Sequence, residues 1–272
     1  MDITFNNEFS LSDYKMVVLN DYERPLFPAI TNKTKDVPGR AGAWDFGIDI
    51  GIRTETYPIV CKATSGFERD KLIREFIGKL YDLKGQPKTY KIQTNFDPQL
   101  WIECRVSAQT SGKYYRGGHV VFELQFTAFD DPFKRGTQTA FDPTEPVYYG
   151  EVQSGDYYKN PETFNWLYST HYFGCYNYGS LETDIIFTLT GASAKDASIL
   201  HMESGRELTL PDFSNATVVI DTKKKTIKIN GQNVVSGTNL KFFSLYPGAN
   251  GFAFKGSGVK GKVTSEWLHK FI

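Results

Sequence analysis

Histidine is the residue type in this chain that most readily binds a metal ion or transfers a proton, yet its spacing supports neither role. His119, His171, His201 and His269 form no His-x-His or His-Glu-x-x-His pattern, which would bring two imidazoles to one metal. The sequence also lacks a Gly-x-Ser-x-Gly elbow and a Gly-Lys-Ser/Thr phosphate loop. We therefore expect no catalytic residues, no metal and no cofactor, and we predict that the protein is not an enzyme.

Two further motifs could indicate chemistry, but their context favours structural roles. Asp130 and Asp131 are adjacent, and neighbouring strand residues point to opposite faces, so the two carboxylates do not easily share one substrate. Gly256–Gly261 matches the Gly-x-Gly-x-x-Gly string of dinucleotide sites, which requires a helix to begin inside the motif. Val259 and Val263 alternate with lysines here, so we predict a glycine-rich hairpin instead.

The segment Asp36–Phe46 combines a proline, two glycines, an arginine and two aromatic residues, and contains no histidine or nucleophile. This composition predicts a fixed backbone shape that presents Arg40. By hypothesis, Arg40 acts with Trp44 and Asp45, because an arginine can donate two parallel hydrogen bonds to a carboxylate. Two alternatives stay open: the three residues fix the loop within their own chain, or they contact a neighbouring subunit.

An aromatic cluster in the second half has three possible roles. Its members are Trp166, Tyr168, Tyr172, Phe173, Tyr176 and Tyr178. Aromatic side chains supply much of the energy of cores and interfaces, so core packing or a protein interface is the simpler interpretation. The third alternative is a sugar-stacking platform, with Trp166, Tyr168, Tyr172 and Tyr176 as the candidate partner or sugar contacts.

Composition excludes several broad classes of function. The chain has 272 residues and no net charge, with 31 Lys and Arg against 31 Asp and Glu. We expect no nucleic-acid binding, because neutralising phosphate backbones requires an excess of basic residues. The three cysteines form no Cys-x-x-Cys pair and are odd in number, which predicts assembly in a reducing compartment without a disulfide framework. Cys61 and Cys104 lie in alternating strand patterns, which predicts that they are buried free thiols. We also expect neither a secretion signal nor a membrane span.

Hydrophobic periodicity predicts strands and one helix in the first half. Phe46–Ile52 and Tyr57–Ala63 alternate with a period of two, which is typical of half-buried strands. The period then changes to that of one helix face over Leu72–Leu83, and Ser65 and Glu68 have the spacing of a capping box. Strands return over residues 102–108 and 120–128. We predict a small α+β domain over residues 1–135.

The second half is predicted to be almost entirely β. Alternation stops between Asp130 and Pro161, which predicts a linker or extended arm at the start of a second domain, residues 136–272. Beyond it, Asn230-Gly231 predicts a tight hairpin. Closely spaced short strands with turn signals favour a β-sandwich. The expected fold class is therefore mainly β.

Several motifs, in this order, resemble a known family. Val37–Gly47, with its Pro-Gly-Arg-x-Gly core, resembles a signature near the N-terminus of the distal tail proteins of long-tailed, non-contractile phages. The end of the predicted helix and the strand that runs into Asp131-Pro132 are similar to the rest of that family's first domain. Further similar segments are Asn177–Gly179, Thr183–Gly191, Val219–Asp221 and Leu245–Asn250. The sequence departs from the family pattern at one place. The short spacer that usually precedes the Asn-x-Gly motif is expanded here and includes the aromatic stretch Phe164–Tyr178.

The resemblance implies a structural virion protein of the distal tail tip, assembled in the cytoplasm of the host bacterium. It implies a split-barrel-like N-terminal domain with one helix, which forms a homo-hexameric ring, followed by a galectin-like β-sandwich. The ring would join the major tail tube protein to the tail-associated hub or lysin protein, and the sandwich often holds receptor-binding proteins. Ring closure requires two different contact patches on each subunit.

Two other functions compete with this expectation. The second domain could be a carbohydrate-binding module for host cell-wall sugars, although a fold alone does not define a function. A glycosidase would need two carboxylates about 5–10 Å apart, and nothing in the sequence indicates such a pair.

Overall fold

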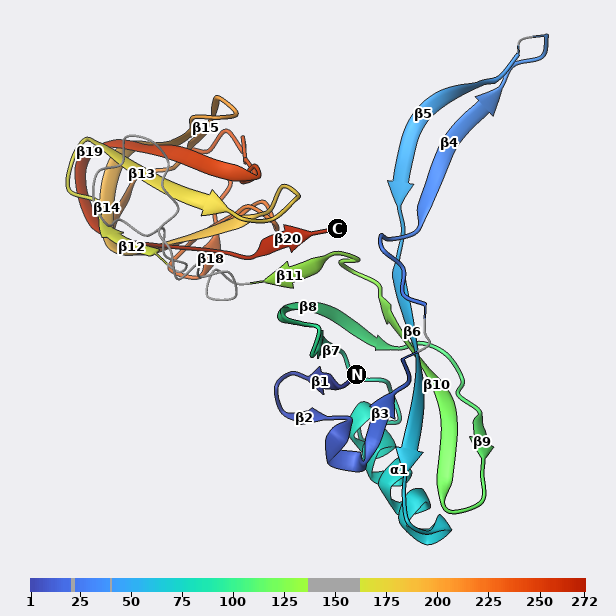
Figure 1. The fold of residues 1–272 in the computed structure, drawn as a ribbon. Helices are drawn as coiled ribbons and strands as arrows, with labels where there is room; N and C mark the ends of the chain where they lie inside the picture. The colour runs from blue at the N-terminus through green and yellow to red at the C-terminus, as the bar shows by residue number, and fades with distance from the viewer. Residues whose placement is uncertain (21–22, 40, 137–161) are drawn as a thin grey trace. The chain divides into compact units, whose positions relative to one another are not determined.

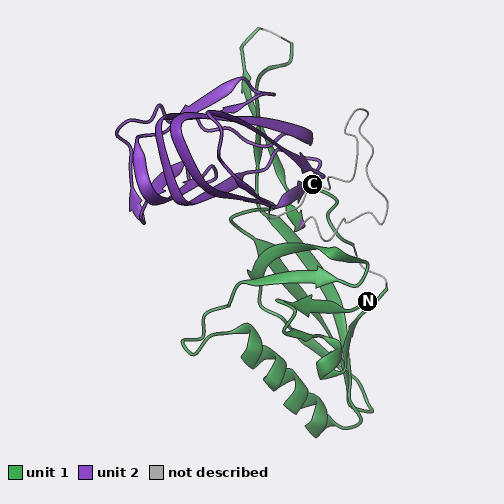
Figure 2. Cartoon of the chain, turned by 90° about the vertical axis from the view of Figure 1, so that its left-hand side faces the viewer, with its two compact units in different colours: residues 1–135, 272 green, residues 136–271 purple. Residues whose placement is uncertain are grey.

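The computed structural model describes residues 1–20, 23–39, 41–136 and 162–272. The chain divides into two compact units, Met1–Arg135 with Ile272 and Gly136–Phe271 (Figures 1 and 2). Most of the linker or extended arm predicted between Asp130 and Pro161 lies outside the described residues, since only its first part, to residue 136, is described. Within them, the fold is mainly β with a single α-helix, which confirms the predicted fold class.

Unit 1 is built on one antiparallel sheet that curls into a half-barrel (Figure 1). The strand order is β2-β1-β7-β8-β10-β6-β3, with β9 beside β10 and β11 beside β8. A short 3-10 helix, η1 (Ser12–Tyr14), precedes β3. The strands are β1 (Ile3–Phe5), β2 (Phe9–Ser10), β3 (Met16–Val18), β6 (Arg53–Lys62), β7 (Tyr90–Thr94), β8 (Asp97–Val106), β9 (Gly112–Tyr114), β10 (His119–Ala128) and β11 (Lys134–Gly136).

The core of unit 1 is formed by residues of this sheet together with Phe76 and Leu80 of the α-helix. Alternate residues of β6 and β10 are buried there, as their alternation predicts. Phe5 is fully buried, and its ring lies 5.7 Å from the ring of Phe126 and 5.9 Å from that of Phe76. Cys61 and Cys104 are buried free thiols, as expected.

The helix α1 (Gly66–Leu80) begins where the sequence predicts. Ser65 caps it, because its hydroxyl accepts a 3.2 Å hydrogen bond from the amide of Glu68. Hydrogen bonds from Lys15 and Thr64 lower the pKa of the Glu68 carboxyl to about 2. Leu80 is buried, but Leu83 lies beyond the end of the helix and is exposed. The prediction that Leu83 belongs to the buried face was therefore wrong, since the chain leaves the helix at Tyr81.

Unit 2 contains two long, bent strands, β14 and β19, that pair with each other along most of their lengths. The other strands are short, and several of them extend the sheet on either side of this pair. The strands are β12 (Glu162–Asn165), β13 (Thr170–Asn177), β14 (Ile185–His201), β15 (Arg206–Thr209), β16 (Phe213–Asp221), β17 (Thr226–Ile229), β18 (Gln232–Asn233), β19 (Gly248–Trp267) and β20 (His269–Phe271).

The two halves of these long strands belong to two layers. The first half of β14 pairs with β16 and the second half with β15, while β19 pairs first with β13 and then with β12. The layers face each other across the core, where the ring of Phe187 lies 5.4 Å from that of Phe252 and 5.3 Å from that of Phe254. A sandwich predicted from short strands is thus formed mainly by two long strands that cross between layers.

The bend in β19 explains a second departure from prediction. Gly256–Gly261 lies inside β19, in a region where its pairing with β14 shifts register between Ser193 and Ser198. The prediction of a hairpin there was wrong, because these residues bend a single strand instead of reversing the chain. The predicted hairpin at Asn230-Gly231 does form and joins β17 to β18.

Candidate interaction sites

A two-stranded hairpin leaves the main sheet of unit 1 and forms no strand pair with it. This arm consists of β4 (Ile30–Asp36) and β5 (Ala43–Ile50), and every described side chain in both strands is exposed. It extends away from the rest of unit 1 (Figure 1). An eight-residue strand spans roughly 26 Å. The prediction of a half-buried strand over Phe46–Ile52 was wrong about burial. The strand forms, but within the described chain no hydrophobic core covers its apolar side chains.

A β-bulge divides the arm into two halves. Asn32 pairs with Ile48, whereas Thr34 pairs with Asp45, so β5 has one more residue than β4 between these pairs. Gly47 lies in the bulge at φ +90°, a conformation that favours glycine, and its amide donates a 2.8 Å hydrogen bond to Asp45 Oδ1. The extra residue changes which side chains share a face.

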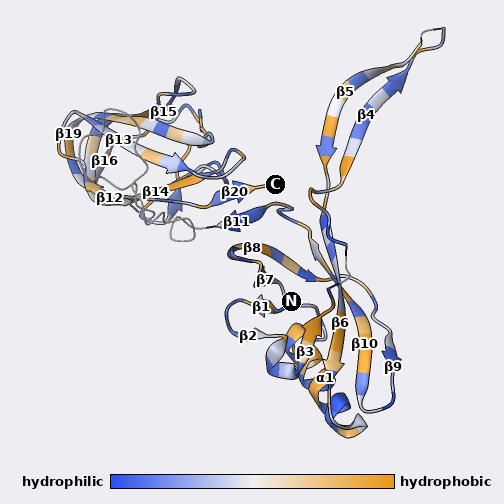
Figure 3. Ribbon diagram, viewed as in Figure 1, coloured by the Kyte–Doolittle hydropathy of each residue, from blue (hydrophilic) through white to orange (hydrophobic). Residues whose placement is uncertain are grey.

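Cross-strand partners point to the same face, so the register assigns each apolar side chain to a side of the arm. Ile30, Ile48 and Ile50 share one face near the root, and we call them the root patch. Trp44, paired with Lys35, falls on the other face with Phe46, and we call these two the tip patch. Each of these five side chains is more than half exposed. Hydrophobic residues recur along β5 in Figure 3.

The polar side chains of the arm confirm this assignment of faces. Lys33 and Asp49 form an ion pair with a 2.6 Å N–O distance, which requires them to lie on the same side, behind the root patch. Thr31, the partner of Asp49, lies there too, while Thr34 and Asp45 lie behind the tip patch. Each half of the arm is therefore amphipathic, and the two halves face opposite ways.

A buried charged cluster anchors the root of the arm. Arg53 lies three residues after the end of β5, and its Nη2 donates a 2.7 Å hydrogen bond to the carbonyl of Pro25, five residues before the start of β4. Its Nε donates to Glu55 Oε1 at 3.0 Å, and the Tyr57 hydroxyl donates to the other oxygen of Glu55. Both charged side chains are buried. One arginine thus ties both ends of the hairpin to the sheet.

Sequence reasoning did not identify this cluster as a site. Continuing the alternation of Phe46–Ile52 would place Arg53 on the polar side of that strand, but Arg53 is the first residue of β6 and is buried. The sequence does contain a signal for this burial, because strand residues two apart point to the same side. Arg53 and Glu55 therefore share their side of the strand with Tyr57 and the buried Ile59. Within the described chain, Arg53 Nη1 is buried without a hydrogen-bond partner.

The predicted loop-fixing residues fall near the tip of the arm. Arg40 lies outside the described residues, so its contacts stay a prediction. Asp45 holds the bulge through Gly47, and Trp44 is exposed at the start of β5. The structure therefore shows Asp45 in a contact within its own chain and Trp44 exposed in the same strand.

The predicted aromatic contacts are not brought together on one surface. Trp166 is fully buried, and its Nε1 donates to the carbonyl of Tyr168 at 3.0 Å, so it belongs to the core of unit 2. Tyr168 is exposed and stacks on His171 with ring centroids 6.3 Å apart. Tyr172 and Tyr176 lie on the outer face of β13, opposite the buried Phe173.

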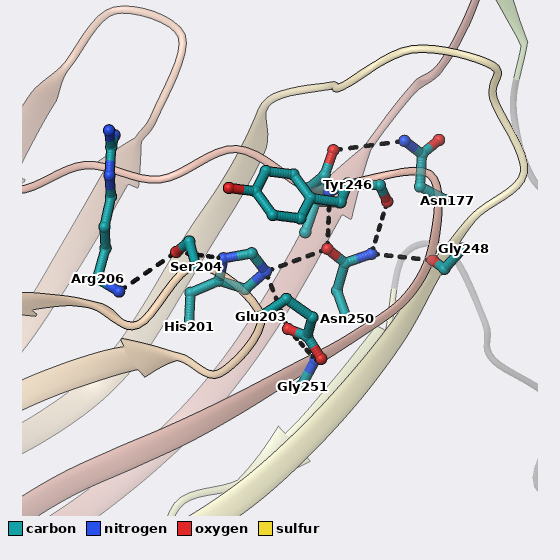
Figure 4. A network of polar contacts seen from close by, with 10 residues as sticks. Asn177, His201, Glu203, Ser204, Arg206, Tyr246, Gly248, Asn250 and Gly251 are labelled. Carbon is teal, nitrogen blue, oxygen red and sulfur yellow. Dashed lines mark hydrogen bonds and ion pairs between the residues drawn. The ribbon is translucent and has the colours of Figure 1, made fainter.

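A polar network joins the turn after β14 to the start of β19 (Figure 4). His201 is fully buried; its Nδ1 lies 2.8 Å from Ser204 Oγ, and its Nε2 lies 3.1 Å from both Asn250 Oδ1 and Glu203 Oε2. Asn250 in turn accepts from the amide of Tyr246 at 2.7 Å and donates to its carbonyl at 2.8 Å.

Serine, histidine and glutamate together are residue types of a hydrolytic triad, but this geometry is structural. The imidazole has no exposed surface, and its ring packs on Phe252 at 5.0 Å. The Ser204 hydroxyl also accepts from the amide of Arg206 at 3.3 Å, and Glu203 is held by the amide of Gly251. The network therefore fixes the turn against β19 and leaves no nucleophile aimed at solvent.

Searches for other kinds of site give negative results within the described residues. No group of three or more His, Cys, Asp and Glu side chains in them could hold a metal ion. None of the described helices is long and apolar enough to cross a membrane. Asp131 has a structural role, since its carboxylate accepts a 2.8 Å hydrogen bond from Arg135 Nε.

Exposed large apolar side chains are concentrated in unit 1. Apart from the arm, they include Phe67, Ile77 and Leu83 on and after α1, and Tyr114 and Tyr115 beside β9. Fewer are found in unit 2, among its described residues 136 and 162–271. They are Leu167, Tyr168, Tyr172, Met202, Val235, Leu240 and Tyr246.

Comparison with known proteins assigns both units. A model of the RIFT-related domain of phage tail proteins matches residues 9–128, and a model of the C-terminal domain of siphovirus-type tail components matches residues 178–271. The crystal structure of SPP1 Dit, described as a paradigm of the hub adsorption apparatus in phages that infect Gram-positive bacteria, aligns with a TM-score of 0.70 at 14% identity and covers 100% of both chains. That likeness shows a shared fold.

Two structures of the phage P2 baseplate in its activated conformation also align. The one with Ca has a TM-score of 0.45 at 11% identity, and covers 97% of each chain. The one with Sr has a TM-score of 0.44 at 12% identity, and covers 97% of this chain and 96% of the other. No curated protein sequence matches the chain.

These two domains, in this order, define a structural component of the phage tail tip and not an enzyme. The chain belongs to the distal tail protein (Dit) family of siphophages, which confirms the resemblance of its motifs.

Proposed function

We propose that the protein forms a homo-hexameric ring through unit 1 at the distal end of the tail. The ring joins the major tail tube protein to the tail-associated hub or lysin protein, and unit 2 holds receptor-binding proteins. The observation that carries the proposal is the concentration of exposed apolar side chains in unit 1. Large exposed apolar surfaces are typical of protein contacts, and a ring needs two different patches on each subunit.

Native mass spectrometry of the purified full chain over a range of concentrations tests the ring. We expect a species with six times the mass of the chain, and electron microscopy of that species should show a ring with a lumen. A chain that stays monomeric at every concentration, or that forms a closed dimer, would contradict the proposal.

Arg40 is proposed to take part either in its own loop or in a ring contact. Arg40→Ala in the full chain distinguishes these, because only the second role requires the hexamer to weaken. An unchanged mass distribution would exclude the contact with a neighbour.

A second candidate function is recognition of host cell-wall sugars by unit 2. It is favoured by Tyr172 and Tyr176, which lie on the outer face of β13 with Gly174 between them. Aromatic faces of this kind can stack on the apolar faces of sugars. The test is titration of the full chain with wall polysaccharide: saturable binding that Tyr172→Ser abolishes would support this function, and no binding would exclude it.

A further inference from the structure

The apolar side chains of the arm change from one face to the other at the bulge. A hairpin that covered a single surface would not need this change of face. The root patch (Ile30, Ile48 and Ile50) and the tip patch (Trp44 and Phe46) are on opposite faces, each with polar residues behind it. Burying both patches while keeping both polar backs in water requires two separate surfaces. Isolated two-stranded hairpins are also only marginally stable in water, so partners would stabilise this one.

We propose that the arm is a two-sided clasp between copies of this chain, with its root patch on one neighbouring copy and its tip patch on another. This rests on the proposed ring. The arm thereby links two surfaces that a hairpin with regular alternation could not reach with the same side chains. Gly47 makes the linkage possible, because its bulge turns the tip half over.

A second copy fits as the occupant because unit 1 itself offers apolar surface outside the arm. Phe67, Ile77 and Leu83 are exposed on and just after α1, and Tyr114 and Tyr115 are exposed beside β9. A head-to-tail contact pairs two different patches of the same chain, which is the relation between an arm and such a surface.

Charge is consistent with this occupant. Residues 30–50 contain three basic and three acidic side chains, namely Lys33, Lys35, Arg40, Asp36, Asp45 and Asp49. The whole chain is also neutral, with 31 residues of each sign. Copies therefore have no net repulsion to overcome, and the arm shows no excess charge that would call for an oppositely charged partner.

The first experiment measures, by native mass spectrometry, the concentration at which half of the full chain is assembled. The tip variant is Trp44→Ser with Phe46→Ser, and the root variant is Ile48→Ser with Ile50→Ser. We expect each pair to raise that concentration by about tenfold or more, since buried aromatic and aliphatic anchors dominate such contacts. Thr31→Ser and Thr34→Ser are matched controls behind the two patches, and should change it by less than about twofold.

A third variant tests the bulge itself. Inserting one threonine between Lys33 and Thr34 gives β4 a partner for the extra residue of β5, so regular pairing can return and Phe46 turns to the face of the root patch. We expect this variant to lose assembly at least as strongly as the tip variant. Circular dichroism should show no loss of fold in any variant, because the altered side chains are exposed.

The outcomes separate the clasp from the ring. If the unaltered chain assembles and only one pair of substitutions weakens it, the arm is one-sided and the two-sided clasp is overturned. If neither pair of substitutions weakens assembly, the arm does not join copies, and the clasp is overturned while the proposal of a ring stands. A chain that never assembles overturns both proposals.

Thiol labelling gives an independent readout that does not depend on affinity. The three native thiols, Cys61, Cys104 and Cys175, are all buried, so labelling reports an introduced cysteine. Phe46→Cys and Ile48→Cys should react quickly with a maleimide in dilute monomer and at least about tenfold more slowly in the assembled state. Equal rates in both states at either position would contradict the clasp.

Discussion

At the scale of single residues, the most consequential side chain is a buried arginine. Arg53 ties Pro25 to Glu55 and so connects both ends of the arm to the main sheet. A buried ion pair contributes little net stability, but removal of one partner leaves an uncompensated charge. The same residue therefore matters both for the stability of unit 1 and for the direction of the arm.

Arg53→Ala should lower the free energy of unfolding by about 3–5 kcal/mol, because Glu55 stays buried without its partner. Replacing both, as Arg53→Met with Glu55→Leu, should cost less than the single change. Urea unfolding of the full chain measures these values. The exposed pair Arg24 and Asp97 is the control: Arg24→Ala should cost no more than about 1 kcal/mol. Equal losses for Arg53→Ala and Arg24→Ala would contradict the role of burial.

His269 makes the stability of unit 2 depend on pH. Burial lowers its pKa from 6.5 to about 4, and its Nδ1 accepts a 3.2 Å hydrogen bond from the amide of Tyr178. In the unfolded chain the imidazole binds a proton at higher pH than in the folded one. The free energy of unfolding should therefore fall as the pH is lowered from about 6.5 to about 4, by on the order of 3 kcal/mol.

Thermal unfolding between pH 4 and pH 7 measures this dependence. His269→Gln should reduce it for unit 2, whereas His119→Gln, at an exposed position, should leave it unchanged. A His269→Gln variant with the full pH dependence of the unaltered chain would assign the effect to other groups.

At the scale of elements, the arm is separable from the fold that carries it. Backbone hydrogen bonds between the two sides of the arm continue to Ala29, whose carbonyl accepts a 2.7 Å bond from the Gly51 amide and whose own amide donates a 3.3 Å bond to the Ile52 carbonyl. Beyond that point no strand of the described chain pairs with β4 or β5 other than each other. The arm is therefore joined to unit 1 mainly by its covalent connections, and its strands contribute no buried side chains to that unit.

Replacing residues 30–50 with Asn-Gly should close a two-residue hairpin at this point and keep unit 1 folded. We expect the free energy of unfolding to change by less than about 1 kcal/mol, because no buried side chain is removed. Urea unfolding checks this expectation. A loss of several kcal/mol would mean that the arm stabilises its own unit.

At the scale of the whole molecule, the two units have separate hydrophobic cores. Phe126 lies in the core of unit 1 and Phe187 in that of unit 2, and both are almost completely buried. Deleting such a side chain typically costs about 3–5 kcal/mol. The cost should appear only in the unit that contains the substitution.

Denaturant unfolding followed by hydrogen exchange of each unit tests this separation. Phe126→Ala should lower the unfolding midpoint of unit 1 alone, and Phe187→Ala that of unit 2 alone. If either substitution lowers both midpoints equally, the chain unfolds as one cooperative body.

Local sequence patterns predicted much of both units. The alternation of β6 and β10, the capped helix and the Asn230-Gly231 hairpin all appear as expected, because each depends on short-range geometry and a single buried face. The family resemblance added the order of the domains. Among the predicted site residues, Trp44 and Asp45 lie in β5, and their roles stay a prediction, while Trp166 lies in the core of unit 2.

The sequence by itself determined the strands, the helix and the absence of catalytic motif spacings, since these depend on neighbouring residues. Only the tertiary structure decided that Phe46–Ile50 faces solvent, that Gly47 turns half of the arm over, and that Arg53 is buried at its root. The physical reason is that alternation reports one apolar face but not what covers it. Whether that face meets its own core or another chain depends on contacts between residues distant in sequence.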